Sequence, residues 1–380
     1  MTLRLFRYLA KEVLVSTAGV TLILLLVILS SRFVSYLGRA TEGKMTFEFL
    51  FTILGFHIPS FVQIILPIAF FLSLLLTFGR LYIENEMSVL FSSGISKLKL
   101  AGYTLGIAGI VLSLSAGLNF WLTPTSEYHA VKAADEQGQL STFSFLLPRR
   151  FQGDGQRTTY IDSFTPDEGW MNDVFLSDFV RENGKSIPVQ MLASYAEEIK
   201  MDSKNGQNYL VFKNGVRYEG VPGTATYRVT EFDTYAMRME SAPQASITDP
   251  ETRSTLSLLG SADPEDQEEL QWRIALVVMI PILSIIGLSL SQVNPRQGRF
   301  FKMLPAILLM ILYMALLIWG KTAIGKGKIP DYLGLWWIHG IFLFIAIGLF
   351  VQYNQMFSRK NARLPNAQSP DPQDTSLSNE

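Results

Sequence analysis

The chain has 380 residues, of which 48% are hydrophobic and 17% are charged, and its formal net charge is −1. A chain this close to neutral lacks the basic surface that neutralises nucleic-acid phosphates, so we expect no nucleic-acid partner. The absence of cysteine excludes disulfides, iron–sulfur clusters and thiolate zinc sites. No motif in the sequence predicts a cofactor, a metal site or a catalytic residue.

Six long stretches of the chain contain no Asp, Glu, Lys or Arg. A helix needs about 20 predominantly apolar residues to cross a bilayer, and soluble proteins rarely contain such long uncharged helices. The stretches are residues 13–31, 49–79, 100–126, 274–295, 303–320 and 332–358. The sequence therefore predicts an α-helical transmembrane bundle of six helices, with three in residues 1–122 and three in residues 271–357. Pro59 and Pro67 predict kinks in the second helix.

The loop between the second and third stretches predicts a short amphipathic helix at about residues 84–98. Its apolar side chains would share one helical face: Met87, Leu90, Phe91, Ile95 and Leu98. Such a helix either lies in the lipid interface or docks on a cytoplasmic partner. Because Glu84 and Glu86 are unfavourable beside anionic lipid, the docking hypothesis is favoured.

Residues 123–270 separate the third and fourth stretches and have the composition of a soluble domain. Polar and apolar residues alternate with a period of two at 216–219 and 226–230, which is typical of half-buried strands. Turn signals occur at 202–206, 213–215 and 221–223. We predict an all-β domain, an antiparallel sandwich or roll, whose strand edge is either capped or open to a partner strand.

Basic residues flank the first and fifth stretches on the side of the insert: Arg32, Arg39, Lys44, Lys321, Lys326 and Lys328. They either contact an anionic lipid headgroup or anchor the helices in the interface. Lys and Arg are equally frequent on both sides of the bundle, so the positive-inside rule does not set the orientation. Residues 358–380 are rich in Pro, Asn, Gln, Ser and Asp, which predicts a disordered cytoplasmic tail.

Several short motifs resemble those of the lipopolysaccharide export permease family, and of its F-type branch in particular. They are Arg7-Tyr8-Leu9, Ile65-Leu66-Pro67, the segment 81–86 (LYIENE), Ser93-Gly94-Ile95-Ser96, the segment 293–299 (VNPRQGR) and Gly325-Lys326-Gly327-Lys328. The likeness covers residues 4–356, and the segment 293–299 is its most specific part.

This resemblance implies a periplasmic β-jellyroll between the third and fourth helices and a heterodimer with a G-type permease subunit. It also implies two cytoplasmic ATPase subunits, a bitopic C-type periplasmic partner and lipopolysaccharide as the substrate. A glutamate after the second span docks in the ATPase in such transporters, and Glu84 occupies that place, with Glu86 and Phe91 in the same coupling segment. The expected lipid-headgroup contacts are Arg32, Arg39, Lys321 and Arg217, and Ser35 stands where relatives can carry a basic residue.

We therefore expect a non-hydrolytic permease subunit in the cell inner membrane that extracts lipopolysaccharide and feeds it to a periplasmic bridge. One alternative is a membrane-anchored scaffold or assembly protein with a periplasmic β domain. Another is an enzyme acting on lipid, which would need paired catalytic carboxylates near the bilayer. The adjacent residues Asp135 and Glu136 do not face each other on a helix, which argues against the enzyme.

Overall fold

The computed structural model describes residues 2–41, 45–139, 148–153, 157–165, 170–182, 185–200, 208–220, 227–238, 248–292, 303–330 and 333–361. It divides into two compact units. The helical unit comprises residues 1–28, 58–127 and 250–380, and the β unit comprises residues 29–57 and 128–249. Six of the described helices are long and apolar enough to cross a membrane, which confirms the predicted bundle.

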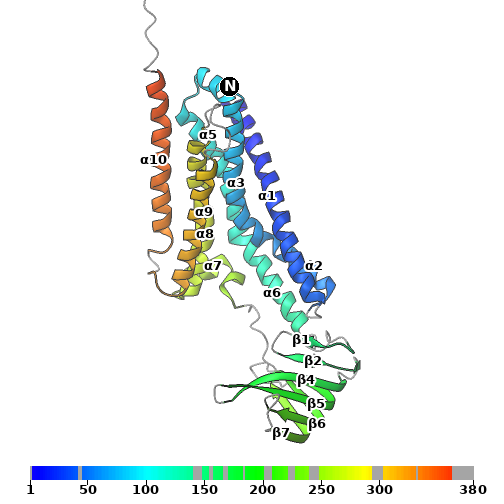
Figure 1. Ribbon diagram of the computed structural model, residues 1–380. Coiled ribbons are helices and arrows are strands. Elements are labelled where there is room, and N and C mark those ends of the chain that lie inside the picture. Colours follow the sequence, from blue (N-terminus) through cyan, green and yellow to red (C-terminus); the bar gives the residue numbers. More distant parts are fainter. Residues whose placement is uncertain are drawn as a thin grey trace, which may run out of the picture. The chain divides into compact units, whose positions relative to one another are not determined.

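Helix α8 (Pro264–Leu290) is the centre of the helical unit, where it contacts α3 (Ile58–Ile83), α5 (Lys97–Gly117), α9 (Met303–Gly325) and α10 (Trp336–Asn361) (Figure 1). In its most apolar stretch, 72% of the α8 residues are buried, compared with 28% in α10. The peripheral helices therefore leave apolar side chains exposed, as expected of surfaces that face lipid or another membrane protein.

Helix α1 (Thr2–Thr41) is longer than the predicted first span and packs against the helical unit only near its beginning. Leu9, Ala10 and Val13 lie in a buried cluster with residues of α3, α5 and α8. Further along, only 11% of its most apolar stretch is buried, and side chains such as Ile23 and Val27 are 63% exposed. One end of α1 is thus held by the helical unit while much of its length is open.

The predicted second span is two helices, α2 (Phe47–Phe56) and α3, separated at His57. Thr46 caps α2 by accepting a hydrogen bond from the Phe49 N–H at 3.2 Å. Pro59 is the second residue of α3, where a missing N–H costs nothing, whereas Pro67 lies inside the helix. The proline at position 59 therefore marks a helix start, not a kink.

The predicted amphipathic helix at 84–98 is wrong in length. Helix α4 covers only Glu86–Ser92, and Gly94 follows it with a φ of +91°, a conformation that ends helices. Ser96 then caps α5 by accepting a hydrogen bond from the Lys99 N–H at 3.2 Å. Leu98 therefore belongs to α5 and not to the apolar face of α4.

The third span also continues beyond its predicted end. Helix α5 passes through a five-residue π-helix, η1 (Leu118–Leu122), into α6 (Thr123–Gln139). On the other side of the insert, η2 (Pro250–Thr252) and α7 (Thr255–Leu258) precede α8. Helices thus occupy both ends of the segment 123–270 that was expected to form the β domain.

The strands form one antiparallel sheet in the order β1-β2-β4-β5-β6-β7, with β3 paired to β4. Their bounds are β1 Gln152–Gly153, β2 Thr158–Tyr160, β3 Ser163–Thr165, β4 Trp170–Glu182, β5 Lys185–Lys200, β6 Asn208–Glu219 and β7 Arg228–Arg238. The predicted β domain between the third and fourth spans is confirmed, although helices flank it. The turn signals at 202–206 and 221–223 lie outside the described residues, as do the tail from residue 362 and the segment 293–299.

The turn predicted at 213–215 is a local irregularity inside β6. Asn214 has a φ of 52° and Asp173 in β4 a φ of 47°, yet the strand register is the same on both sides of them. The side chains that face the apolar cluster change phase at this row: Met171 precedes it in β4, whereas Val174 and Leu176 follow it. A single left-handed residue thus moves every later side chain of its strand to the other face.

Candidate functional site

The corner between α3 and α4 presents one of the three predicted coupling residues, Glu84, to solvent. Asn85 forms this corner with a left-handed backbone (φ 60°), which asparagine tolerates better than most residues do. Glu84 is exposed and lies 3.5 Å from the Arg80 guanidinium on the preceding turn of α3. Glu86 is half-buried, and Phe91 packs against the buried cluster that includes Met87.

Two polar contacts attach this corner to α1. Tyr8 Oη donates a 2.8 Å hydrogen bond to Glu86 Oε2, and Arg80 Nη2 lies 2.5 Å from Glu12 Oε2. Arg80 therefore stands between two carboxylates, one on α1 and the other that of Glu84. Glu86, predicted to contact a partner, is instead engaged within the chain.

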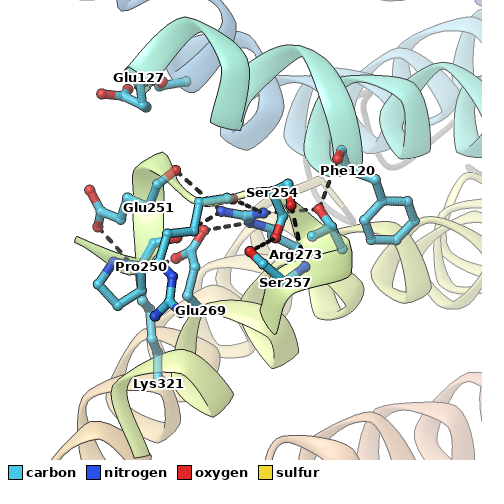
Figure 2. Close-up of polar contacts among 12 residues, drawn as sticks. Phe120, Glu127, Pro250, Glu251, Ser254, Ser257, Glu269, Arg273 and Lys321 are labelled. Carbon is cyan, nitrogen blue, oxygen red and sulfur yellow. Dashed lines mark hydrogen bonds and ion pairs between the residues drawn. The ribbon is translucent and has the colours of Figure 1, made fainter. Parts of the chain in front are cut away.

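A second polar cluster lies where η2 and α7 meet α8 and α9 (Figure 2). Lys321, a predicted headgroup contact, has its Nζ 3.2 Å from Glu269 Oε2 and 3.8 Å from Glu251 Oε1, and 5.3 Å from the Trp272 ring centre. Its side chain is 21% exposed. The lysine is thus positioned at the surface but already carries acidic partners.

Arg273 is the centre of this cluster and its side chain is only 2% exposed. Its Nε donates to Glu269 Oε1 at 2.8 Å, and its four remaining N–H groups meet Thr255 Oγ1 and the main-chain oxygens of Pro250, Glu251 and Arg253 at 2.9–3.2 Å (Figure 2). A guanidinium has five N–H donors, so every one is satisfied. The ion pair with Glu269 and the four further hydrogen bonds together offset the desolvation of this buried charge.

Neither Arg273 nor Glu269 is among the predicted site residues, because the uncharged stretch that predicts the fourth span begins only at residue 274. Both residues are inside α8, where 9% of the Glu269 side chain is exposed. The available signal was their spacing of four residues, which places opposite charges on one helical face.

The remaining predicted headgroup contacts belong to the β unit. Arg32 and Arg39 are exposed residues of α1, seven positions apart and so on one helical face. Arg217 lies in β6, where it pairs with Glu219 and donates to Tyr235 Oη at 2.9 Å. Tyr235 packs on the apolar cluster of the sheet, so Arg217 is on the inner face with its charge compensated. Lys321 belongs to the helical unit.

The structure explains why glycine occupies two positions of the segment Gly325-Lys326-Gly327-Lys328. A Cβ at Gly325 would lie 1.6 Å from Glu268 Oε2, so any larger residue would displace the Glu268 carboxylate of α8. Gly327 has a φ of +64° in the turn that ends α9. The two glycines therefore make room for the Glu268 side chain and allow the turn.

Comparison with known proteins decides the family. The model of the family "Lipopolysaccharide export system permease LptF/LptG" matches residues 7–352. The LptF permease proteins of Escherichia coli K12 and Shigella flexneri are each 30% identical over 368 residues, covering 94% of this chain and 99% of the relative. The chain belongs to the LptF/LptG family. It is accordingly a multi-pass protein of the inner membrane whose β unit is periplasmic.

Membership in the LptF/LptG family sets the orientation that the distribution of Lys and Arg left open. With the insert in the periplasm, the chain must cross the bilayer so that the α3–α4 corner is cytoplasmic, because one span separates the two. The Arg273 cluster lies in the N-terminal half of α8, which follows the periplasmic insert, and is therefore on the periplasmic side. The two polar clusters therefore serve opposite faces of the membrane.

Proposed function

We propose that this chain is the permease subunit of an ATP-binding-cassette transporter that extracts lipopolysaccharide from the inner membrane and passes it to a periplasmic protein bridge. Its proposed partners are a G-type permease subunit, two cytoplasmic ATPase subunits and a bitopic C-type subunit. The observation that carries this proposal is the family match across residues 7–352. It is supported by relatives named as permeases of a lipopolysaccharide export system that align over 99% of their length.

The geometry of the α3–α4 corner supports Glu84 as the residue that couples the permease to the ATPase. Its only ion pair among the described residues is the exposed 3.5 Å contact with Arg80, which is worth little and is easily exchanged. A partner can therefore engage the Glu84 carboxylate without breaking the fold. Glu86 and Phe91 have a different role, because their contacts with α1 and the buried cluster fix the shape of the corner.

The lipid-binding part of the proposal combines apolar and basic surfaces. The open face of α1 exposes Leu22, Ile23 and Val27, which suit acyl chains or a second permease subunit. Arg32 and Arg39 share one face at the periplasmic end of the same helix, as expected for contacts with a phosphorylated headgroup. Arg217 contributes less to a headgroup because Glu219 already neutralises it.

A comparison of the native protein with a Glu84→Ala variant tests the proposal. The protein is purified from its native membrane with the subunits that accompany it, reconstituted, and assayed for ATP hydrolysis and for lipopolysaccharide release. We expect Glu84→Ala to assemble in the membrane but to lose most lipopolysaccharide release. The control is Glu265→Ala, which removes an exposed glutamate at the periplasmic end of α8 and should behave like the native protein.

Two results would contradict the proposal. Normal lipopolysaccharide release by the Glu84→Ala complex would refute the coupling role. If neither an ATPase subunit nor a glycolipid accompanied the purified native protein, the scaffold hypothesis would replace the transporter.

A further inference from the structure

The π-helix η1 interrupts the helix that leads from the membrane into the β unit. A π-turn inserts an extra residue into an α-helix and often occurs at functional sites, where it can bend the helix. Asn119, in this turn, is fully buried and donates from Nδ2 to the Ser115 carbonyl at 2.8 Å, but its Oδ1 accepts no hydrogen bond from the described residues. The turn therefore interrupts the regular α-helix and holds a buried acceptor that no described donor meets.

A continuous series of polar contacts joins η1 to Lys321. The Phe120 carbonyl accepts a 2.8 Å hydrogen bond from Thr255 Oγ1, which itself accepts one from Arg273 Nη1 at 2.9 Å. Arg273 binds one oxygen of Glu269, and Lys321 lies 3.2 Å from the other oxygen (Figure 2). The series thus crosses from α9 through α8 and α7 to the π-helix, entirely within the helical unit.

We propose that this series couples phosphate binding at Lys321 to the bend of the helix at η1. The inference rests on the proposed function for its ligand, a phosphorylated glycolipid. A lipid phosphate competes with Glu269 for the Lys321 ammonium, because both are anions and the amine can be drawn to the exposed side. The ligand favours the state in which Lys321 has left Glu269, and this differential binding is what shifts the conformation.

Arg273 transmits the change because it has no spare donor. All five N–H groups are engaged and the side chain is buried, so a shift of Glu269 must be accommodated by a change at another acceptor. Thr255 is the one side-chain hydroxyl among these acceptors, and it in turn holds the Phe120 carbonyl. Arg273 is thus a positioning residue that acts through Thr255 on the π-helix.

A distance measured along the single helix α5–η1–α6 tests the proposal. The chain has no cysteine, so spin labels can be attached at Leu98→Cys and Thr125→Cys, two exposed positions of the helical unit on either side of η1. The two positions lie 27 residues apart and would be about 40 Å apart in a straight helix at 1.5 Å per residue. The labelled full chain, with its accompanying subunits in phosphatidylethanolamine nanodiscs, is measured with and without purified lipopolysaccharide.

We expect lipopolysaccharide to shift this distance in the native background and Thr255→Val to remove most of the shift. Valine preserves the shape of threonine but breaks both hydrogen bonds of the hydroxyl. Thr322→Val is the matched control and should keep the shift, because the one partner of the Thr322 hydroxyl among the described residues is the Ile318 carbonyl of its own helix, at 3.1 Å. Arg273→Lys, which keeps the charge but loses the fork of donors, should behave like Thr255→Val.

Lipid retained after size-exclusion chromatography is quantified on the same samples, which separates binding from bending. The proposal is overturned if Thr255→Val shows the native shift, or if the native protein binds lipopolysaccharide without any shift, and in both cases the proposed function stands. Loss of lipid binding by Thr255→Val would also overturn it, since that would indicate a purely structural role. If the native protein binds no lipopolysaccharide, the proposed function fails and this inference fails with it.

Discussion

Tyr8 and Glu86 are 78 positions apart in the chain, yet the tyrosine hydroxyl donates a 2.8 Å hydrogen bond to the glutamate carboxylate. Each residue belongs to a short motif by which the sequence resembles the permease family, Arg7-Tyr8-Leu9 and the segment 81–86. The two motifs are thus the two sides of one contact, which ties the beginning of α1 to the corner that carries Glu84.

Removal of the Tyr8 hydroxyl should loosen this contact without unfolding the protein. A hydrogen bond to a charged group contributes about 1.5–3 kcal/mol when buried, and less in this exposed position. We expect Tyr8→Phe to accelerate hydrogen exchange in α4 and to reduce lipopolysaccharide released per ATP hydrolysed. Tyr128→Phe, which alters a tyrosine of α6, serves as the control. Unchanged exchange in α4 would show that the Tyr8–Glu86 bond does not hold the corner.

Arg80 and Glu12 allow a charge-reversal experiment on the same connection. Their side chains are 39% and 34% exposed, so the pair should be worth about 0.2–1 kcal/mol. Arg80→Glu places three carboxylates together and should impair transport strongly. Combining it with Glu12→Arg restores opposite charges across the 2.5 Å contact and should recover part of the activity. No recovery in the double variant would indicate that the contact with Glu84, rather than that with Glu12, is the important one.

The bundle could be predicted from the sequence because lipid imposes a simple requirement, a long stretch without charges. The same requirement predicts a start of the fourth span at residue 274, whereas α8 begins at Pro264, because a helix can continue through charged residues outside its apolar stretch. Glu269 and Arg273 neutralise each other inside α8, and a pattern of hydropathy alone does not reveal such a pair. The sequence does contain signals for a short α4. Gly94 is typical of a helix end, and Ser96 is typical of the cap of the next helix.

The strands show a different limit of the sequence. A period of two predicts that side chains alternate between faces, but it cannot show where the alternation changes phase. That change occurs at one position in each of four strands, Asp173, Ser194, Asn214 and Asp233. These residues are distant in the chain and lie in one row only because the strands pair on both sides of them. The Asn214-Gly215 dipeptide predicts a hairpin turn, because the left-handed geometry that such a turn requires is the same as that of Asn214 inside β6.

Removal of Lys321 and removal of its partner Glu269 should differ in their effect on stability. Lys321→Ala leaves Glu269 paired with Arg273, so we expect a loss below about 1 kcal/mol. Glu269→Ala leaves a buried guanidinium without its counter-ion, which costs about 3–5 kcal/mol. Thermal inactivation followed by size-exclusion chromatography should therefore rank Glu269→Ala far below Lys321→Ala. Equal midpoints for the two variants would mean that Glu269 does not neutralise Arg273.

Among the described glycines of the β unit, Gly215 is the one where a side chain is least tolerable. A Cβ there would lie 2.5 Å from the Leu192 carbonyl oxygen and 2.5 Å from the Phe232 ring. The carbonyl belongs to β5, whose pairing with β6 prevents it from moving away, so Gly215→Ala should destabilise the sheet by about 1–3 kcal/mol.

Hydrogen exchange in β5 and β6 measures this effect, with Gly38→Ala as the matched control in the same unit. Nothing lies within 4 Å of a Cβ at Gly38, and alanine is the better helix former, so that change should be neutral or slightly stabilising. Faster exchange confined to the β unit in Gly215→Ala would locate the damage at the row where the side chains change face.

The same variant tests the transport role of the β unit. Because the jellyroll is proposed to receive the lipid from the membrane helices, lipopolysaccharide release should fall in Gly215→Ala while ATP hydrolysis continues. Release at the native level despite faster exchange would mean that the row at Asp173, Ser194, Asn214 and Asp233 serves folding alone.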